Sequence, residues 1–305
     1  MGFRILVLML VCGASGCSLL PQRLHQPTVH NPFPQLSKVA VAPFFNLTAE
    51  PTLDGRQVAL AYFNELQLVP GFEVVPVGVV ERVMLEHRLP LNSAEDARRL
   101  AKFLQVDAVV IGAITDYSPY YPPRMGLQVE WYAANPGFHS IPPGYGLPWG
   151  THEEQEIPGP LIFETEFALA REQLKTQTPQ CPEAEPSAKS GGASKAEAEE
   201  AAAEWPDPRG LVPRPPSRTP PACWPTSSPV LKHTRTYNGH DGEFTAALES
   251  YFAFRDDARF DGWQGYLQRS DEFIRFCCHM HIWEMLTARG GAGETRVVWR
   301  WPSIR

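Results

Sequence analysis

The sequence has 305 residues with 34 acidic and 27 basic side chains, which gives a formal net charge of −7 at pH 7. Binding to nucleic acid phosphates depends on clustered lysine and arginine, and no such cluster stands out, so we expect no nucleic acid partner. The six cysteines do not resemble a disulfide framework. Cys181 and Cys223 could pair in an oxidising compartment, which the sequence alone does not establish.

The first 16 residues have the three parts of a secretory signal peptide. Arg4 provides a positive charge, residues 5–11 form an apolar run, and residues 13–16 are the small residues that a signal peptidase needs near its cut. The apolar run is far shorter than the roughly 20 residues that a transmembrane helix needs. We therefore expect residues 1–16 to be removed as a signal peptide.

A cysteine follows directly after these small residues. The run Ala14-Ser15-Gly16-Cys17 resembles a lipobox, in which the cysteine sulfur receives a diacylglycerol and becomes the mature N-terminus. It departs from that pattern at Ala14, where leucine is usual, and the alternative is an ordinary secretory signal followed by an incidental cysteine. Ser18, rather than aspartate, implies the outer membrane by the Gram-negative sorting pattern. We expect a lipid on Cys17 to anchor the chain at the periplasmic face of that membrane.

The residues after the cysteine change character near residue 37. Residues 17–36 contain several prolines and few periodic apolar side chains, so they are expected to be a lipidated tether. Residues 38–44 then predict a short strand, and residues 53–69 place apolar side chains at helical spacing. A proline and a glycine end this helix, and residues 72–77 predict a second strand.

Further helices and strands follow in a regular order. Residues 80–87 predict a short helix, and Ser93 is predicted to cap the next one. Residues 106–115 form a continuous apolar run, typical of a strand buried on both faces, and residues 126–132 predict another strand. The order β-α-β-α-α-β-β predicts an α/β fold in which helices pack on a mixed sheet of three to five strands.

A long polar stretch interrupts the second half of the chain. Residues 161–171 and 230–237 alternate between apolar and polar side chains, and we expect them to form one antiparallel hairpin. Residues 173–228 are dominated by proline, alanine, glutamate and serine, which cannot bury enough apolar surface to fold, so they predict a disordered insertion at the hairpin tip. The α/β module then consists of residues 37–172 and 229–240.

The C-terminal part is predicted to be helical over residues 241–290. Its strongest pattern is an amphipathic helix over residues 271–288, with Gly290-Gly291 as the cap. Residues 291–305 are expected to be a tail. The complete prediction is thus an α/β module followed by a C-terminal helical segment.

Three motifs in the first module carry a family resemblance. Residues 39–46 (VAVAPFFN) match a VAVLPFxN strand and turn, residues 71–76 (GFEVVP) match a GxFxVV strand, and residues 101–112 (AKFLQVDAVVIG) match an AkxLgvDaVvxG helix-to-strand segment. Together they make residues 37–117, about a quarter of the chain, similar to a periplasmic module found in three envelope protein groups. These are the curli-secretion-channel lipoprotein, the penicillin-binding-protein activator lipoprotein and the N-terminal domain of the Tol translocation protein.

The resemblance implies a function in protein contact, because in those families the module serves pore assembly or enzyme activation. Their partner-binding residues match no motif in this sequence, so no site residue is carried over. The motif residues themselves are predicted to specify the fold: Pro43 ends a strand, Asp107 caps a turn, and Gly112 allows close approach of another element.

The amphipathic C-terminal helix raises the alternative of a metal site. Its candidate ligands are Cys277, Cys278, His279, His281 and Glu284, some of which share a helical face. One helix cannot complete a tetrahedral site, and no second cluster of cysteine and histidine accompanies it. We therefore predict no metal and interpret the cysteines as small buried residues.

The most unusual stretch is the run DYSPYYPPR at residues 116–124. Tyrosine and arginine are favoured in the energetic centres of protein interfaces. Tyr117, Tyr120, Tyr121 and Arg124 are therefore the candidate partner-binding residues. The alternative is an ordered connection whose tyrosines cover the edge of the sheet.

No phosphate-binding loop, Gly-x-Ser-x-Gly elbow or His-Glu-x-x-His motif is present, so we assign no catalytic residue and no cofactor. The expected function is that of a non-enzymatic bacterial cell-envelope lipoprotein that acts as a protein-interaction, assembly or regulatory module for an unidentified envelope protein. One alternative is an oligomeric export-channel component like the curli lipoprotein, which needs long strands able to form a barrel. Another is an envelope hydrolase, which needs a convergent polar pocket.

Overall fold

The computed structural model describes the backbone of six segments of the chain, namely residues 22–26, 28–138, 140–177, 227–255, 261–293 and 296–300. The chain divides into two units, residues 1–168 with 225–305 and residues 169–224. The first unit contains the sheets and the helices that pack on them.

Strands and helices alternate in the first part of the chain, and helices dominate the last part. The strands are β1 (Gln22–Gln26), β2 (Lys38–Val41), β3 (Phe45–Asn46), β4 (Glu73–Val75), β5 (Ala108–Ser118), β6 (Arg124–Ala133), β7 (Leu231–Asn238) and β8 (Arg296–Arg300). The helices are α2 (Gly55–Leu66), α3 (Val77–His87), α4 (Ala94–Leu104), α5 (Gly159–Gln177), α7 (Gly242–Arg255), α8 (Gly265–Gln268) and α9 (Ser270–Thr287), with 3₁₀ turns at His152–Glu156 and Gly262–Gln264.

The main sheet is mixed and has six strands, in the order β4-β2-β5-β6-β7 with the two-residue β3 beside β5. Strand β2 pairs in parallel with β4 and β5, whereas β6 is antiparallel to both β5 and β7. Helical crossovers connect the parallel strands, and a short hairpin connects β5 to β6. The predicted α/β class with a mixed sheet is confirmed, with one strand more than expected.

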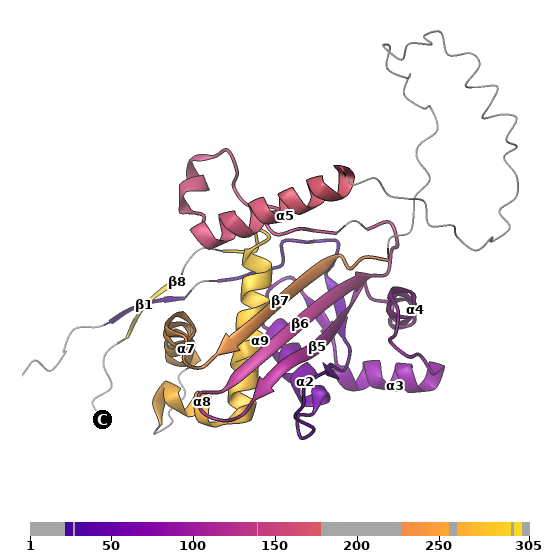
Figure 1. The fold of residues 1–305 in the computed structure, drawn as a ribbon, viewed down its shortest axis with the longest axis horizontal. Helices are drawn as coiled ribbons and strands as arrows, with labels where there is room; N and C mark the ends of the chain where they lie inside the picture. The colour runs from indigo at the N-terminus through magenta and orange to yellow at the C-terminus, as the bar shows by residue number, and fades with distance from the viewer. Residues whose placement is uncertain are drawn as a thin grey trace, which may run out of the picture. The chain divides into compact units, whose positions relative to one another are not determined.

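Helices cover the two faces of the sheet unequally (Figure 1). On one face, residues of α2, α7, α8 and α9 belong to one buried cluster with strand residues such as Val110 and Trp131. On the other face, α3 and α4 cover Val109 and its neighbours, so β5 is buried on both faces where its apolar run is continuous. The same face of β6 and β7 is polar, and Glu130 pairs there with Lys232 at 2.6 Å.

Capping residues start two helices where the sequence predicts them. Asp54 caps α2 by accepting a hydrogen bond from the backbone N–H of Arg56 at 2.9 Å. Ser93 caps α4 by accepting one from the backbone N–H of Asp96 at 3.2 Å, which confirms its predicted role. Each cap satisfies an N–H group that has no partner within its own helix.

The C-terminal helices belong to the same core as the sheet. Leu248 of α7 and Phe276 and Ile282 of α9 are part of one continuous cluster of buried side chains that includes the inner face of β6. The predicted helices are confirmed, and they form a layer of the module rather than a separate body. Within the described residues, none of the helices combines the length and the apolar character needed to cross a membrane.

The strand predicted over residues 161–171 is wrong, because these residues belong to helix α5. Its expected hairpin partner, β7, pairs instead with β6, from Trp131–Leu231 to Arg124–Asn238. A short run in which apolar residues dominate fits a strand and a helix almost equally well. Here the helix is favoured by a proline in the first turn and by the alanine, leucine, glutamate and lysine residues that follow.

The segments expected to be a tether and a tail contain a second, two-stranded sheet. Strand β1 is antiparallel to β8, and an isolated bridge joins Val29 to Ala292. Phe33 and Leu36 are buried in the core, so the expected tether is part of the module at its C-terminal end. The sequence did not indicate this sheet, because each of its two strands forms its hydrogen bonds with a strand from the other end of the chain.

Several predictions fall outside the described residues. The signal peptide of residues 1–16, the lipidated Cys17, and Cys181 and Cys223 all lie there. The insertion predicted over residues 173–228 is described only at its two ends, the first of which belongs to α5.

Of two residues singled out from the motifs, Gly112 has the role expected of it, whereas Asp107 links two strands instead of capping a turn. The Asp107 carboxylate accepts hydrogen bonds from the backbone N–H groups of Ser37 and Lys38, at 3.0 and 2.8 Å, and so joins the start of β2 to the start of β5. Gly112 lies against the buried ring of Phe44, and a Cβ atom at this position would be 2.4 Å from that ring. Only glycine allows this approach without moving the ring.

Gly112→Ala is expected to lower the free energy of unfolding by about 1–3 kcal/mol, because the added methyl group must displace the Phe44 ring. Gly78→Ala in α3 is the matched control: a Cβ atom there meets nothing within 4 Å, and alanine is a better helix former than glycine. Urea unfolding followed by circular dichroism measures both variants. Equal stability of the two variants would contradict the packing of β5 against Phe44.

Candidate functional site

The predicted partner-binding residues lie at and beside the tip of the β5–β6 hairpin. Tyr120 and Tyr121 are in the connection between the two strands, and they are 79% and 73% exposed. Tyr117 is on β5 and packs partly against the core, while Arg124 is the first residue of β6. The structure therefore separates the four candidates into two exposed tyrosines and two residues of the strands that carry them.

Contacts within the hairpin and with the residue after β7 support this tip. Arg124 forms an ion pair with Asp116 across the hairpin. The backbone carbonyl of Pro123 accepts a hydrogen bond from the N–H of Gly239, directly after β7, at 2.8 Å. Strands β5 and β6 are paired along nearly their whole length, with a single irregularity near Asp116. The two exposed tyrosines thus project from a short connection held by three strands.

Helix α9 carries the residues that suggested a metal site, and the structure divides them among different surroundings. Cys277 and Cys278 are buried in the core, His279 faces α2, and His281 and Glu284 face β7. Burial raises the pKa of both thiols, so they remain protonated and unreactive. In the described segments, no three side chains of histidine, cysteine, aspartate or glutamate gather closely enough to hold a metal ion.

Glu65 of α2 is a buried carboxylate surrounded by donors from two other helices. Its Oε1 accepts hydrogen bonds from Nη2 of Arg255 at 2.7 Å and from the hydroxyl of Tyr251 at 3.1 Å, both on α7. From α9, Nε of Arg275 donates to the same oxygen at 2.8 Å, and Nδ1 of His279 lies 3.2 Å from Oε2. One carboxylate therefore joins three helices.

The surroundings of Glu65 determine its protonation. Burial alone would raise its pKa, but hydrogen bonds from His279 and Arg275, together with electrostatic interactions with His279 and Arg255, outweigh burial and lower the pKa from 4.5 to about 2. Burial and the charge of Glu65 raise the pKa of Tyr251, so that its hydroxyl remains a donor. A carboxylate that stays ionised and accepts four contacts is suited to holding helices together rather than to proton transfer at neutral pH.

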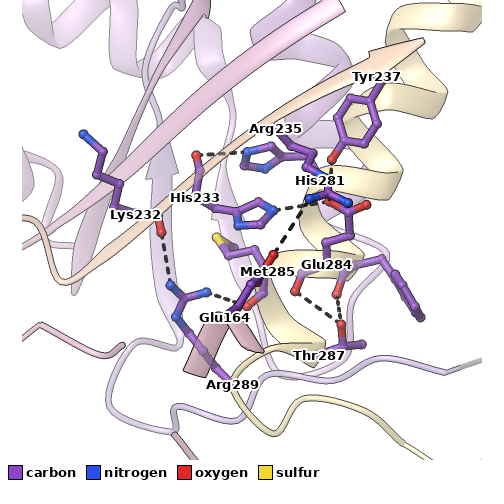
Figure 2. A network of polar contacts seen from close by, with 11 residues as sticks. Glu164, Lys232, His233, Arg235, Tyr237, His281, Glu284, Met285, Thr287 and Arg289 are labelled. Carbon is purple, nitrogen blue, oxygen red and sulfur yellow. Dashed lines mark hydrogen bonds and ion pairs between the residues drawn. The ribbon is translucent and has the colours of Figure 1, made fainter. Parts of the chain in front are cut away.

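A second carboxylate, Glu284 of α9, faces β7 (Figure 2). Its Oε2 accepts a hydrogen bond from the hydroxyl of Tyr237 at 3.0 Å and lies 3.3 Å from Nε2 of His233. Nε of Arg235 is 3.6 Å from the same oxygen, and Nη1 of Arg235 is 3.8 Å from Oε1 of Glu164 on α5. These contacts join the edge strand of the sheet to α9 and to the first part of α5.

Two buried side chains beside this cluster bond to backbone carbonyls (Figure 2). Arg289 donates from three nitrogens to the carbonyl oxygens of Ile141, Met285 and Lys232, at 2.9, 2.9 and 3.1 Å. Burial lowers the pKa of Arg289 to about 10, so it stays charged at neutral pH. Burial also lowers the pKa of His281, which is therefore neutral. Arg289 thus connects the end of α9 to β7 and to the loop before α5.

Sequence reasoning did not find the Glu65 cluster. Glu65 lies on the same helical face as Val58 and Tyr62, and a carboxylate inside an apolar stripe is the signal that could have indicated it. Its partners Arg255 and Arg275 come from segments about 200 residues away, with no pattern that connects them to α2. Their arrangement depends on tertiary packing.

Comparisons with known proteins give partial likenesses to solved structures. No protein-family model and no curated protein matches the sequence. Lipoprotein GNA1162 from Neisseria meningitidis matches with 18% identity and a TM-score of 0.27, over 32% of this chain and 72% of its own. The PelC dodecamer from Paraburkholderia phytofirmans matches with 18% identity and a TM-score of 0.22, over 37% and 71%. The LpoB C-terminal domain from Salmonella enterica matches with 14% identity and a TM-score of 0.23, over 35% and 74%.

These likenesses are partial and distant. With identities and TM-scores this low, they concern part of the fold and carry nothing further about this chain.

Glu65→Gln is expected to lower the free energy of unfolding by about 3 kcal/mol at pH 7, because a pKa lowered from 4.5 to about 2 corresponds to that much stabilisation of the folded state. This stabilisation is fully present above the unfolded pKa of about 4.5 and is lost as the pH falls toward 2. The difference between wild type and variant should therefore shrink below pH 4.5. Urea unfolding at pH 7, 5, 4 and 3 measures it.

Glu73→Gln is the matched control for this series. The Glu73 side chain is 77% exposed, and its ion pair with Nζ of Lys38 is long, at 4.0 Å, so the substitution should change stability little. A penalty for Glu65→Gln that stays constant from pH 7 to pH 3 would contradict the account of Glu65.

Proposed function

We propose that this chain is a non-enzymatic lipoprotein of the bacterial cell envelope that acts by binding another envelope protein through the tip of its β5–β6 hairpin. A lipid on Cys17 anchors it at the periplasmic face of the outer membrane. The module formed by residues 37–172 and 229–240, together with the C-terminal helices, presents the binding surface.

The observation that carries this proposal is the exposure of Tyr120 and Tyr121 at the tip of a well-supported hairpin. Exposed tyrosines bring large apolar area and a hydroxyl group to an interface at little cost in side-chain entropy, and they are enriched among residues that dominate binding energy. Because the strands beneath them are already ordered, binding at the tip requires little further ordering.

The polar groups of the described core support a non-enzymatic role. The carboxylates of Glu65 and Glu284 are both engaged by donors of the protein itself. The thiols of Cys277 and Cys278 are buried and protonated. Each of these groups has a structural explanation within the fold.

The anchor is supported by the N-terminal sequence. The positively charged residue, the apolar run and the small residues before Cys17 are arranged as in a lipoprotein signal, and Ser18 favours the outer membrane. Strand β1 begins at Gln22, only a few residues after Cys17, so a lipid on Cys17 would hold the module close to the membrane surface.

The double substitution Tyr120→Ala with Tyr121→Ala is expected to weaken partner binding about 30-fold or more, because two interface tyrosines together contribute on the order of 2–4 kcal/mol. Thermal stability should stay near that of the wild type, because both side chains are exposed. The partner is first captured in cells with a photoreactive amino acid at position 120 and identified by mass spectrometry. Its affinity for both forms is then measured with purified proteins.

Leu85 of α3 provides the matched control, since it is 80% exposed on a different part of the module. A photoreactive residue at position 85 should give no crosslink to the same partner, and Leu85→Ala should bind it normally. Binding that survives the double tyrosine substitution would refute the proposal, and a crosslink from position 120 only to a second copy of the chain would favour the oligomeric alternative.

A further inference from the structure

A pocket of about 540 Å³ lies between α2, α7 and α9, beside the residues that follow β1. Its volume is within the range of about 300–1,000 Å³ that is typical of small-molecule sites. Its walls come from a different part of the module than Tyr120 and Tyr121, so the contact proposed above does not account for it.

Most of the wall is apolar. The pocket is lined by aliphatic and aromatic side chains from the end of α2 and from the facing sides of α7 and α9, including Val69, Phe254, Met280 and Ile282. An apolar wall of this kind favours an alkyl chain, because burying each methylene group contributes about 0.8 kcal/mol, equal to roughly a fourfold gain in affinity.

One end of the pocket is polar, and its accessible groups are donors. Glu65, Arg255 and His279 all line this end. The Glu65 side chain is only 1% exposed and its oxygens are used by the cluster, whereas the Arg255 and His279 side chains are 23% and 36% exposed. A ligand group at this end therefore meets a guanidinium and an imidazole, a combination that favours an anion.

We propose that this pocket binds an amphiphile with one alkyl chain and an anionic head group, with the chain against α7 and α9 and the head at Arg255 and His279. The simplest such ligand is a medium- or long-chain carboxylate. This proposal rests on the pocket alone and does not depend on the partner contact at the hairpin tip.

Isothermal titration of sodium decanoate onto the full chain carrying Cys17→Ser, which has no acceptor sulfur for a lipid of its own, tests the proposal. Decanoate should bind with one-to-one stoichiometry. Octanoate should bind about 15-fold more weakly than decanoate, because it has two fewer methylene groups to bury. The alcohol 1-decanol should bind about tenfold more weakly than decanoate, because its head group carries no charge. Equal affinity of decanoate and decanol would overturn the assignment of the head group. Absence of decanoate binding would overturn the proposal.

Two substitutions on α7 locate the binding. Ala247 lines the pocket, so Ala247→Phe should fill it and abolish decanoate binding. Ala246 is exposed on the same helix outside the pocket, so Ala246→Phe should bind as the Cys17→Ser chain does. Thermal melts confirm that both variants fold. Unchanged binding to Ala247→Phe, or an equal loss in both variants, would show adventitious association and overturn the proposal.

Discussion

The position of one buried carboxylate constrains how three helices meet on one face of the sheet. Glu65 of α2 is removed from water, and it is tolerated there because α7 and α9 supply two guanidinium groups, a hydroxyl and an imidazole. A buried ion pair of this kind is not a large net source of stability, but removing one member leaves the others without compensation. The cluster therefore links the three helices through charges that must stay paired.

The remaining features of the molecule depend on that arrangement. With α9 fixed against α2, its opposite side meets β7 through Glu284, and its C-terminal end meets the loop before α5 through Arg289. The antiparallel half of the sheet is held in this way, and the tip of the β5–β6 hairpin projects from it. The same three helices leave the apolar pocket between them. The proposed contact surface and the pocket thus share one supporting framework and lie on different parts of it.

The sequence predicts local structure well where a pattern of neighbouring residues is enough to define one helix, strand or helix cap. The apolar run of β5 and the cap at Ser93 each have a physical cause within a few residues, and the structure contains both. The helices around Phe276 are likewise predicted by their spacing. These features concern single elements and their nearest neighbours.

What the sequence does not predict depends on distant partners. Residues 161–171 have an alternating pattern that also fits a helix, and in the folded chain they form α5, with Thr165 buried beside Gly144. Strands β1 and β8 are recognisable only as a pair. The exposed tyrosines were found from composition, because proline and tyrosine together are poorly suited to a core strand. The Glu65 cluster and the pocket beside it were missed, since both are built from segments far apart in the chain.

The central claim about function is that the module is held at a membrane by a lipid on Cys17. Mass spectrometry of the mature N-terminus, on protein extracted from the membrane fraction of cells that express the full chain, tests it most directly. We predict that the first residue is Cys17 carrying a diacylglycerol, and that Cys17→Ser abolishes the modification and the membrane association. A mature protein with an unmodified cysteine, or one that retains residues 1–16 without lipid, would contradict the account.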